Sequence, residues 1–171
     1  MSIIVVGKKN NKINFVADTQ MTYCDEAMSA EKLFETASFV FGLATDNKPD
    51  LTFKSFLEKS SQLKLETVFD VHKLITDFNS YELKDDVELP ASLKFGTDDQ
   101  LLIADKNTHK VFYINPHSMT CYEIDTFGAI GSGSNYAIGA FDAGASLEEA
   151  VKIACKHNIY CSEPISSIEI S

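Results

Sequence analysis

A serine, an aspartate and a lysine near the start of the chain could together perform hydrolysis. Ser2 directly follows Met1, Asp18 ends a short apolar run, and Lys32 follows a polar segment. A serine hydroxyl is a weak nucleophile until a base removes its proton. The α-amine of a chain that starts at Ser2 could be this base, because α-amines titrate at about 7.7–8.0. The predicted chemistry is attack by Ser2 on a carbonyl carbon, without a histidine.

This chemistry requires the removal of Met1, because an amide nitrogen is not basic. We expect removal because the next residue is small. A nearby lysine would lower the pKa of the amine and stabilise the alkoxide, and a carboxylate would hold the lysine in place. Lys32 and Asp18 are the candidates for these two positions. We expect the substitution Lys32→Ala to remove most turnover and to leave the fold intact.

The sequence around Ser2 predicts a β-hairpin that buries the start of the chain. Ile3–Val6 and Ile13–Val16 are short runs rich in apolar residues, and Lys8–Asn11 between them is a turn signal. Chain termini are usually loose, so a terminus inside a sheet indicates that residue 2 has a specific role.

Further strands and four helices follow along the chain. Strands are predicted over Lys32–Glu35, Ser38–Ala44, Gln100–Asp105, Lys110–Ile114, Met119–Ile124, Phe127–Gly131 and Ser166–Ile170. Helices are predicted over Leu51–Leu63, from a capping box at Thr67 to Phe78, over Ser134–Gly144, and from a capping box at Ser146 to about His157. Met21–Ala30 is expected to be irregular and Tyr81–Leu89 to be an acidic connection. Separate groups of helices and hairpins predict an α+β fold with antiparallel sheets.

The bulk composition predicts one soluble domain over residues 1–171. The net charge of −10 argues against a nucleic-acid partner, because no basic stripe could neutralise phosphates. No apolar run reaches membrane-spanning length and no signal peptide is recognisable, so we expect a cytoplasmic protein without a membrane partner. The four scattered cysteines (Cys24, Cys121, Cys155 and Cys161) are expected to be free thiols. No metal site and no cofactor are expected.

Three segments of the sequence carry a more specific signal. They are Ser2–Val5 with Val16–Gln20, then Phe41–Thr45, then Ile130–Gly139 with Asp142. The third segment contains the pattern Gly-Ser-Gly-Ser-x-Tyr-Ala-x-Gly-x-x-Asp, which is quite specific. Together they resemble the proteasome-type β subunits of the N-terminal-nucleophile hydrolases, and the chain is closest in size to the bacterial protease HslV.

The resemblance implies a four-layer αββα sandwich of antiparallel sheets and gives five residues a role. Ser2 takes the place of the N-terminal nucleophile, Asp18 that of a conserved aspartate, and Lys32 that of the catalytic lysine. Ser132 takes the place of a serine that hydrogen-bonds near the terminal amine. The backbone N–H of Thr45 falls where the family has the glycine of its oxyanion hole.

The sequence also departs from the family. The nucleophile is usually threonine, and Ser2 lacks the β-methyl group that restricts χ1. The oxyanion glycine is replaced by Thr45, and the connection from Asp18 to Lys32 is short. The late acidic residue of the family's serine–aspartate pair has no clear counterpart between Cys155 and Ser162.

The function implied by the resemblance is that of a peptidase subunit. Polypeptide substrates would be cleaved inside a homo-oligomeric ring or double ring, fed by an ATPase unfoldase, with the apolar faces of the first helices at subunit contacts. The alternative is a ring-forming or binding subunit that keeps the fold without activity. Gly131–Ser134 before a helix also resembles an anion-binding loop, which is the minor interpretation. The histidines are too scattered for a Ser-His-Asp triad.

Overall fold

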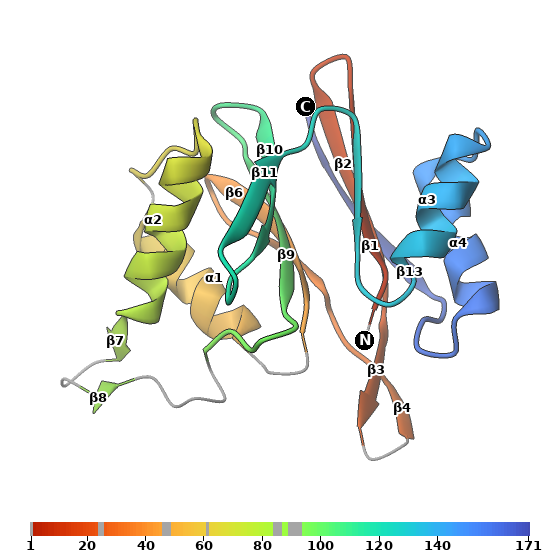
Figure 1. Cartoon of the computed structure of the whole chain (residues 1–171), viewed down its shortest axis with the longest axis horizontal. Coiled ribbons are helices and arrows are strands. Elements are labelled where there is room, and N and C mark those ends of the chain that lie inside the picture. The colour runs from red at the N-terminus through yellow and green to blue at the C-terminus, as the bar shows by residue number, and fades with distance from the viewer. Residues whose placement is uncertain (1, 24–25, 46–48, 61, 84–86, 89–93) are drawn as a thin grey trace.

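The chain forms four layers, with two antiparallel β-sheets face to face between two pairs of helices (Figure 1). The computed structural model describes residues 2–23, 26–45, 49–60, 62–83, 87–88 and 94–171. The αββα sandwich implied by the resemblance is confirmed. Within the described ranges, no helix is long and apolar enough to cross a membrane.

The first sheet contains both ends of the chain. Its strand order is β12 (Phe127–Ile130), β1 (Ile4–Lys9), β2 (Lys12–Asp18) and β13 (Ile165–Ile170). The predicted hairpin is confirmed, and its turn residues Asn10 and Asn11 have φ angles of 51° and 63°. Asparagine tolerates this left-handed conformation, which a tight hairpin turn requires. Because β1 is a central strand, the residues that precede it are fixed from both sides.

The second sheet faces the first across an apolar core. Its strand order is β11 (Thr120–Glu123), β10 (Lys110–Asn115), β9 (Gln100–Asp105), β6 (Phe39–Ala44) and β5 (Leu33–Glu35). The buried residues between the sheets come from both of them, and include Ile4, Phe15, Val40, Leu102 and Ile130. Burial of this apolar surface is the main term that holds the sheets together.

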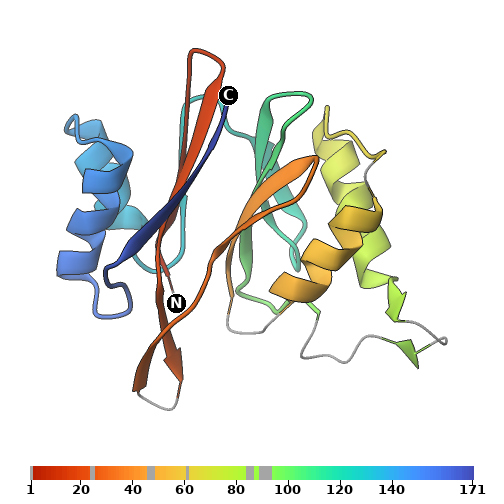
Figure 2. The ribbon, with the colours of Figure 1, turned by 180° about the vertical axis from the view of Figure 1, so that it is seen from behind.

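Two helices cover the outer face of each sheet (Figure 2). The second sheet is covered by α1 (Asp50–Lys59) and α2 (Val68–Asn79), and the first sheet by α3 (Ser134–Asp142) and α4 (Leu147–His157). Both predicted capping boxes are present, at the start of α2 and the start of α4. Helix α1 ends before the predicted boundary, although Leu63 beyond it still packs against the same apolar cluster.

The apolar faces of α1 and α2 are buried inside the chain itself. Phe53, Leu57, Leu74 and Phe78 pack against the second sheet in one cluster of buried residues. The prediction that these faces form subunit contacts is therefore wrong, because each already has a partner within the chain.

The segment after β2 is more regular than the sequence suggests. Gln20–Tyr23 (β3) and Glu26–Ser29 (β4) form a two-stranded antiparallel ribbon that extends from the body of the molecule (Figure 1). The expected irregular segment is thus wrong, and the acidic connection likewise contains two short strands, Glu82–Leu83 (β7) and Val87–Glu88 (β8). Neither pair has the strong apolar alternation that predicts a strand from sequence.

We predict that Phe53→Ala will lower the free energy of unfolding by about 3–5 kcal/mol. The Phe53 ring is fully buried, and its centroid lies 5.0–5.3 Å from those of Phe41, Phe78 and Phe95. The matched control is Phe69→Ala on α2, since Phe69 is 81 % exposed and its loss should change the stability by less than about 0.5 kcal/mol. Urea unfolding measures both, and equal losses would contradict this account of the core.

Candidate active site

The start of the chain is held on both sides of Ser2. The N–H of Ile3 donates to Asp18 Oδ1 at 2.9 Å, and the N–H of Asp18 donates to the Ile3 carbonyl at 3.1 Å. The Ser2 carbonyl accepts the N–H of Gly133 at 3.2 Å and, at the long limit of 3.5 Å, the hydroxyl of Ser132. Ser2 is only 3 % exposed. Residue 2 therefore has a fixed backbone position, unlike most residues near a chain terminus.

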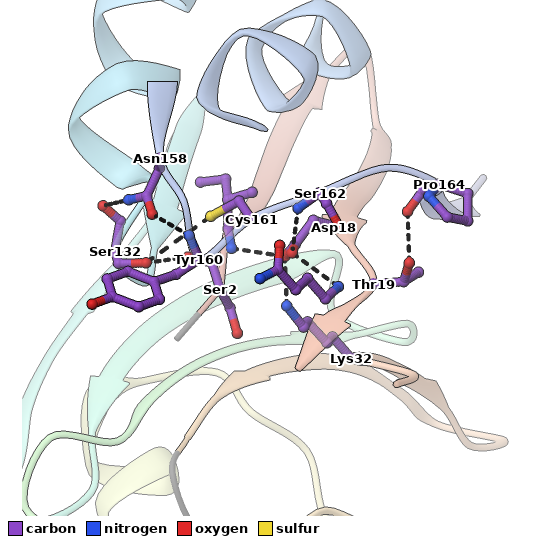
Figure 3. Close-up of polar contacts among 12 residues, drawn as sticks. Ser2, Asp18, Thr19, Lys32, Ser132, Asn158, Tyr160, Cys161, Ser162 and Pro164 are labelled. Atoms are coloured by element: carbon purple, nitrogen blue, oxygen red, sulfur yellow. Dashed lines mark hydrogen bonds and ion pairs between the residues drawn. The ribbon is translucent and has the colours of Figure 1, made fainter. Parts of the chain in front are cut away.

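The Asp18 carboxylate is fully buried and accepts four hydrogen bonds (Figure 3). Oδ1 accepts the Ile3 N–H and the Lys32 ammonium, the latter at 2.6 Å. Oδ2 accepts the N–H groups of Gln20 and Ser162 at 3.1 and 3.3 Å. A carboxylate can remain charged in the interior when a cation and hydrogen bonds compensate the loss of water.

Lys32 reaches Asp18 from the opposite sheet. It directly precedes β5, and its carbonyl accepts the N–H of Leu43 in β6, so its backbone belongs to the second sheet. Asp18 is the last residue of β2 in the first sheet. The Lys32 side chain is buried, and its ion pair with Asp18 spans the space between the two sheets. The structure thus brings together two candidates that the sequence separates by a polar segment.

The Gly131–Gly133 corner wraps around the Ser2 carbonyl. Gly131 has a φ of +90°, and a Cβ atom at this position would lie 2.2 Å from the carbonyl oxygen of Ser2. The N–H of Gly131 donates to the side chain of Gln100 at 2.9 Å. Only glycine combines this conformation with such a close backbone approach. The first glycine of the Gly-Ser-Gly-Ser pattern is therefore required because the backbone of Ser2 leaves no room for a side chain.

Thr45 lies at the same end of the sandwich as this corner. It follows Ala44, the last residue of β6, and Ala44 pairs with Gln100 in β9. Because the Gln100 side chain also binds Gly131, the end of β6 adjoins the corner that encloses the Ser2 carbonyl.

Two residues missed by the sequence prediction contact Ser132. The Asn158 side chain donates from Nδ2 to the Ser132 carbonyl at 2.6 Å, and Cys161 Sγ lies 4.0 Å from the Ser132 hydroxyl oxygen. Asn158 is the residue that caps the C-terminus of α4. The sequence signal that could have identified Asn158 is its place directly after the predicted end of the last helix. It lies between Cys155 and Ser162, where no counterpart of the family's acidic residue was recognised.

Two thiols near the site, one buried and one partly buried, are poor nucleophiles. Burial, with a further contribution from the charge of Asp18, raises the pKa of Cys161 to about 11 and that of Cys155 to about 12. Both are therefore protonated at neutral pH, whereas the thiolate is the reactive form. Cys121, Cys155 and Cys161 are free, as predicted, while Cys24 and Met1 lie outside the described residues. Ser2 thus remains the candidate nucleophile.

The fold is similar to those of several solved structures. These include BPH from Thiobacillus denitrificans in complex with epoxomicin (21 % identity, 99 % of each chain covered, TM-score 0.73) and eukaryotic HslV from Trypanosoma brucei (17 % identity, 98 % of each chain, TM-score 0.74). A Gly-1 mutant of Anbu from Hyphomicrobium sp. strain MC1 has 13 % identity over 99 % of this chain and 81 % of that chain, with a TM-score of 0.70. Neither a protein-family model nor a curated protein matches the chain. The similarity confirms the predicted proteasome-type, HslV-like fold.

We predict that Gly131→Ala will displace the corner from Ser2 and destabilise the protein. The left-handed backbone alone costs roughly 1–3 kcal/mol for a residue with a side chain, and the new Cβ would clash with the Ser2 carbonyl in addition. The control is Gly139→Ala in α3, where an added Cβ meets no atom within 4 Å and alanine favours the helix. Thermal unfolding should show a loss for the first variant and none for the second, and the reverse order would contradict the geometry.

We predict that Lys32→Met will destabilise the fold, which revises the expectation from sequence. Removing the cation leaves a buried carboxylate without its counter-ion, at a cost of about 3–5 kcal/mol. Lys12→Met breaks the exposed ion pair with Glu169 on the same sheet and should cost less than about 1 kcal/mol. Lys32→Arg, which keeps the charge, should lie between them. Denaturant unfolding of the three variants measures this, and equal losses for the two methionine variants would disprove the buried pair.

Proposed function

We propose that this chain is a peptidase subunit of the N-terminal-nucleophile type, with Ser2 as the nucleophile after removal of Met1. The observation that carries the proposal is the shared carboxylate oxygen of Asp18, which binds both the Ile3 N–H and the Lys32 ammonium. A buried cation is thereby held next to the residue whose amine would be the base. An apolar core has no need of such a costly arrangement, whereas catalytic sites use it to tune proton transfer.

The proposed reaction has two stages, each with a complete proton balance. In the first, the α-amine of Ser2 takes the hydroxyl proton while Oγ attacks the carbonyl carbon of the scissile peptide bond. The resulting tetrahedral intermediate collapses, and the ammonium returns its proton to the leaving amine, which leaves an ester on Ser2. In the second, the amine takes a proton from water while the resulting hydroxide attacks the ester carbonyl. The tetrahedral intermediate collapses, the ammonium returns its proton to Oγ of Ser2, and the new carboxyl product is released.

The surrounding groups would support each charge that develops. The positive charge of Lys32 would lower the pKa of the amine and stabilise the alkoxide, and Asp18 holds this charge in place. Ser132, whose hydroxyl lies 3.5 Å from the Ser2 carbonyl oxygen, would orient residue 2. The N–H of Thr45 would stabilise the oxyanion of the tetrahedral intermediate.

The proposal extends to the assembly. The similarity in fold to HslV supports a homo-oligomeric ring or double ring that encloses the active sites, with polypeptide substrates and an ATPase unfoldase as partners. Enclosure would restrict substrates to unfolded chains. The compartment that we propose is the cytoplasm.

We predict that epoxomicin will label residue 2 and no cysteine. An epoxyketone reacts with both the hydroxyl and the free α-amine of an N-terminal serine, and the solved BPH structure contains this inhibitor. Ser2→Ala should abolish labelling without changing the assembly, because one oxygen is lost and the packing remains. Ser2→Thr should keep activity, since the added methyl group mainly restricts χ1.

Intact mass and peptide mapping measure the labelling, and fluorogenic peptide turnover measures the activity. Cys161→Ser is the control, because the thiol is protonated at neutral pH and should not contribute. Labelling that persists in Ser2→Ala would show that the nucleophile lies elsewhere. A purified chain that retains Met1 and is inactive would favour the alternative, a ring-forming or binding subunit without activity.

A further inference from the structure

Gln100 contacts both halves of the candidate site. It is the first residue of β9, and its backbone pairs with Ala44, the residue directly before Thr45. Its side chain reaches toward the first sheet, where Oε1 accepts the N–H of Gly131 at 2.9 Å, directly after β12. One residue therefore links the strand end that carries the proposed oxyanion donor to the corner that encloses the Ser2 carbonyl.

The backbone of Gly131 is in direct contact with Ser2. A Cβ atom on Gly131 would lie 2.2 Å from the carbonyl oxygen of Ser2 and 3.3 Å from its Cβ atom, which carries the hydroxyl. The carbonyl of Gly131 accepts the N–H of Ser134 at 3.1 Å, at the start of α3. A displacement of Gly131 would therefore move the nucleophile with it.

The bond from Gln100 to Gly131 complements the ion pair of Lys32 and Asp18. Both contacts join the second sheet to the first near Ser2. The ion pair holds the start of the chain through the Asp18 carboxylate and would tune the charge of the amine. The Gln100 side chain is neutral, so its bond would act on the geometry of the site and leave the charges of its groups unchanged.

We propose that Gln100 is a positioning residue for the reaction, which sets the distance between the Ser2 hydroxyl and the N–H of Thr45. This inference rests on the proposed function, because it concerns the rate at which Ser2 reacts. The nucleophile precedes a strand of the first sheet and the donor follows a strand of the second, so the attacked carbonyl must fit between the two sheets. A misplacement of about 1 Å between reacting groups can lower a rate by roughly 100-fold.

Three substitutions of Gln100 separate its acceptor oxygen from its size. Gln100→Met keeps the length of the side chain but removes the acceptor of the Gly131 N–H. Gln100→Asn keeps the amide but ends one methylene group too early to reach this N–H. Gln100→Glu keeps an acceptor oxygen at the same place in either protonation state. The matched control Gln62→Met makes the first change at an exposed position after α1.

The test measures epoxomicin labelling of these variants and of the wild type. The endpoint gives the fraction of reactive sites, and progress curves at several inhibitor concentrations give the inhibitor affinity KI and the rate constant kinact. Attack of Ser2 on the ketone of the inhibitor creates an oxyanion, so kinact depends on the proposed donor. The charge of a glutamate would raise the pKa of the amine, so the rates are compared on the plateau of each pH profile.

We expect Gln100→Met and Gln100→Asn to be labelled completely, with KI unchanged and kinact lowered roughly 10- to 100-fold. Gln100→Glu should keep a plateau kinact near the wild-type value, because the acceptor remains. Gln62→Met should leave both constants unchanged. If Gln100→Met does not fold, Gln100→Asn supplies the same comparison with Gln100→Glu.

The outcomes separate positioning from a structural role. A structural role would lower the unfolding temperature and the reactive fraction but leave the kinact of the remaining sites at the wild-type value, and this result would overturn the inference. Equal plateau kinact values for Gln100→Met and Gln100→Glu would overturn it too. A wild-type chain that is not labelled at Ser2 would remove the proposed function and this inference together, whereas labelled wild type with unaffected variants removes the inference alone.

Discussion

The ion pair between Lys32 and Asp18 is the interaction on which the site depends most. It joins the end of β2 in one sheet to the residue before β5 in the other. Most other contacts between the two sheets are made by buried apolar side chains. Because the same carboxylate oxygen binds the Ile3 N–H, the relative position of the two sheets also sets the position of the chain start. Stability and the proposed chemistry share one buried charge pair.

The other supports of Ser2 come from the far end of the sequence. Ser132 lies 130 residues from Ser2, and Ser162 lies 144 residues from Asp18. Such contacts form only when the first sheet, with its central strand β1, and the cover of α3 and α4 are complete. The site therefore forms only in the complete fold. Variants that loosen the sandwich should reduce the fraction of chains with a correctly formed site before they change the chemistry of the sites that remain.

Local signals in the sequence predicted most of the elements, and the resemblance to the family pointed to Asp18 and Ser132 beside residue 2. Some local structures need particular residue types and can therefore be recognised in the sequence. Examples are the Asn10–Asn11 turn, both capping boxes and the Gly131 corner. Long-range partners had no such signal. The β3–β4 ribbon lacks an apolar alternation, and Asn158 is a common residue after a helix whose partner lies 26 residues earlier. The subunit-contact prediction failed because a helical stripe shows that a face is buried, not what covers it.

In the proposed mechanism, the removal of the terminal methionine would control the activity of Ser2. A buried hydroxyl can react only with a base at hand, and the thiol of Cys161, which lies against Ser132, is kept protonated by its own burial. While Met1 is attached, the nitrogen of Ser2 is an amide, so the proposed site would have its nucleophile, lysine and oxyanion donor but no base. Removal of Met1 would add a base that titrates near working pH without moving any strand. The fold can therefore assemble completely before the proposed chemistry becomes possible, which protects the chain from its own activity during folding.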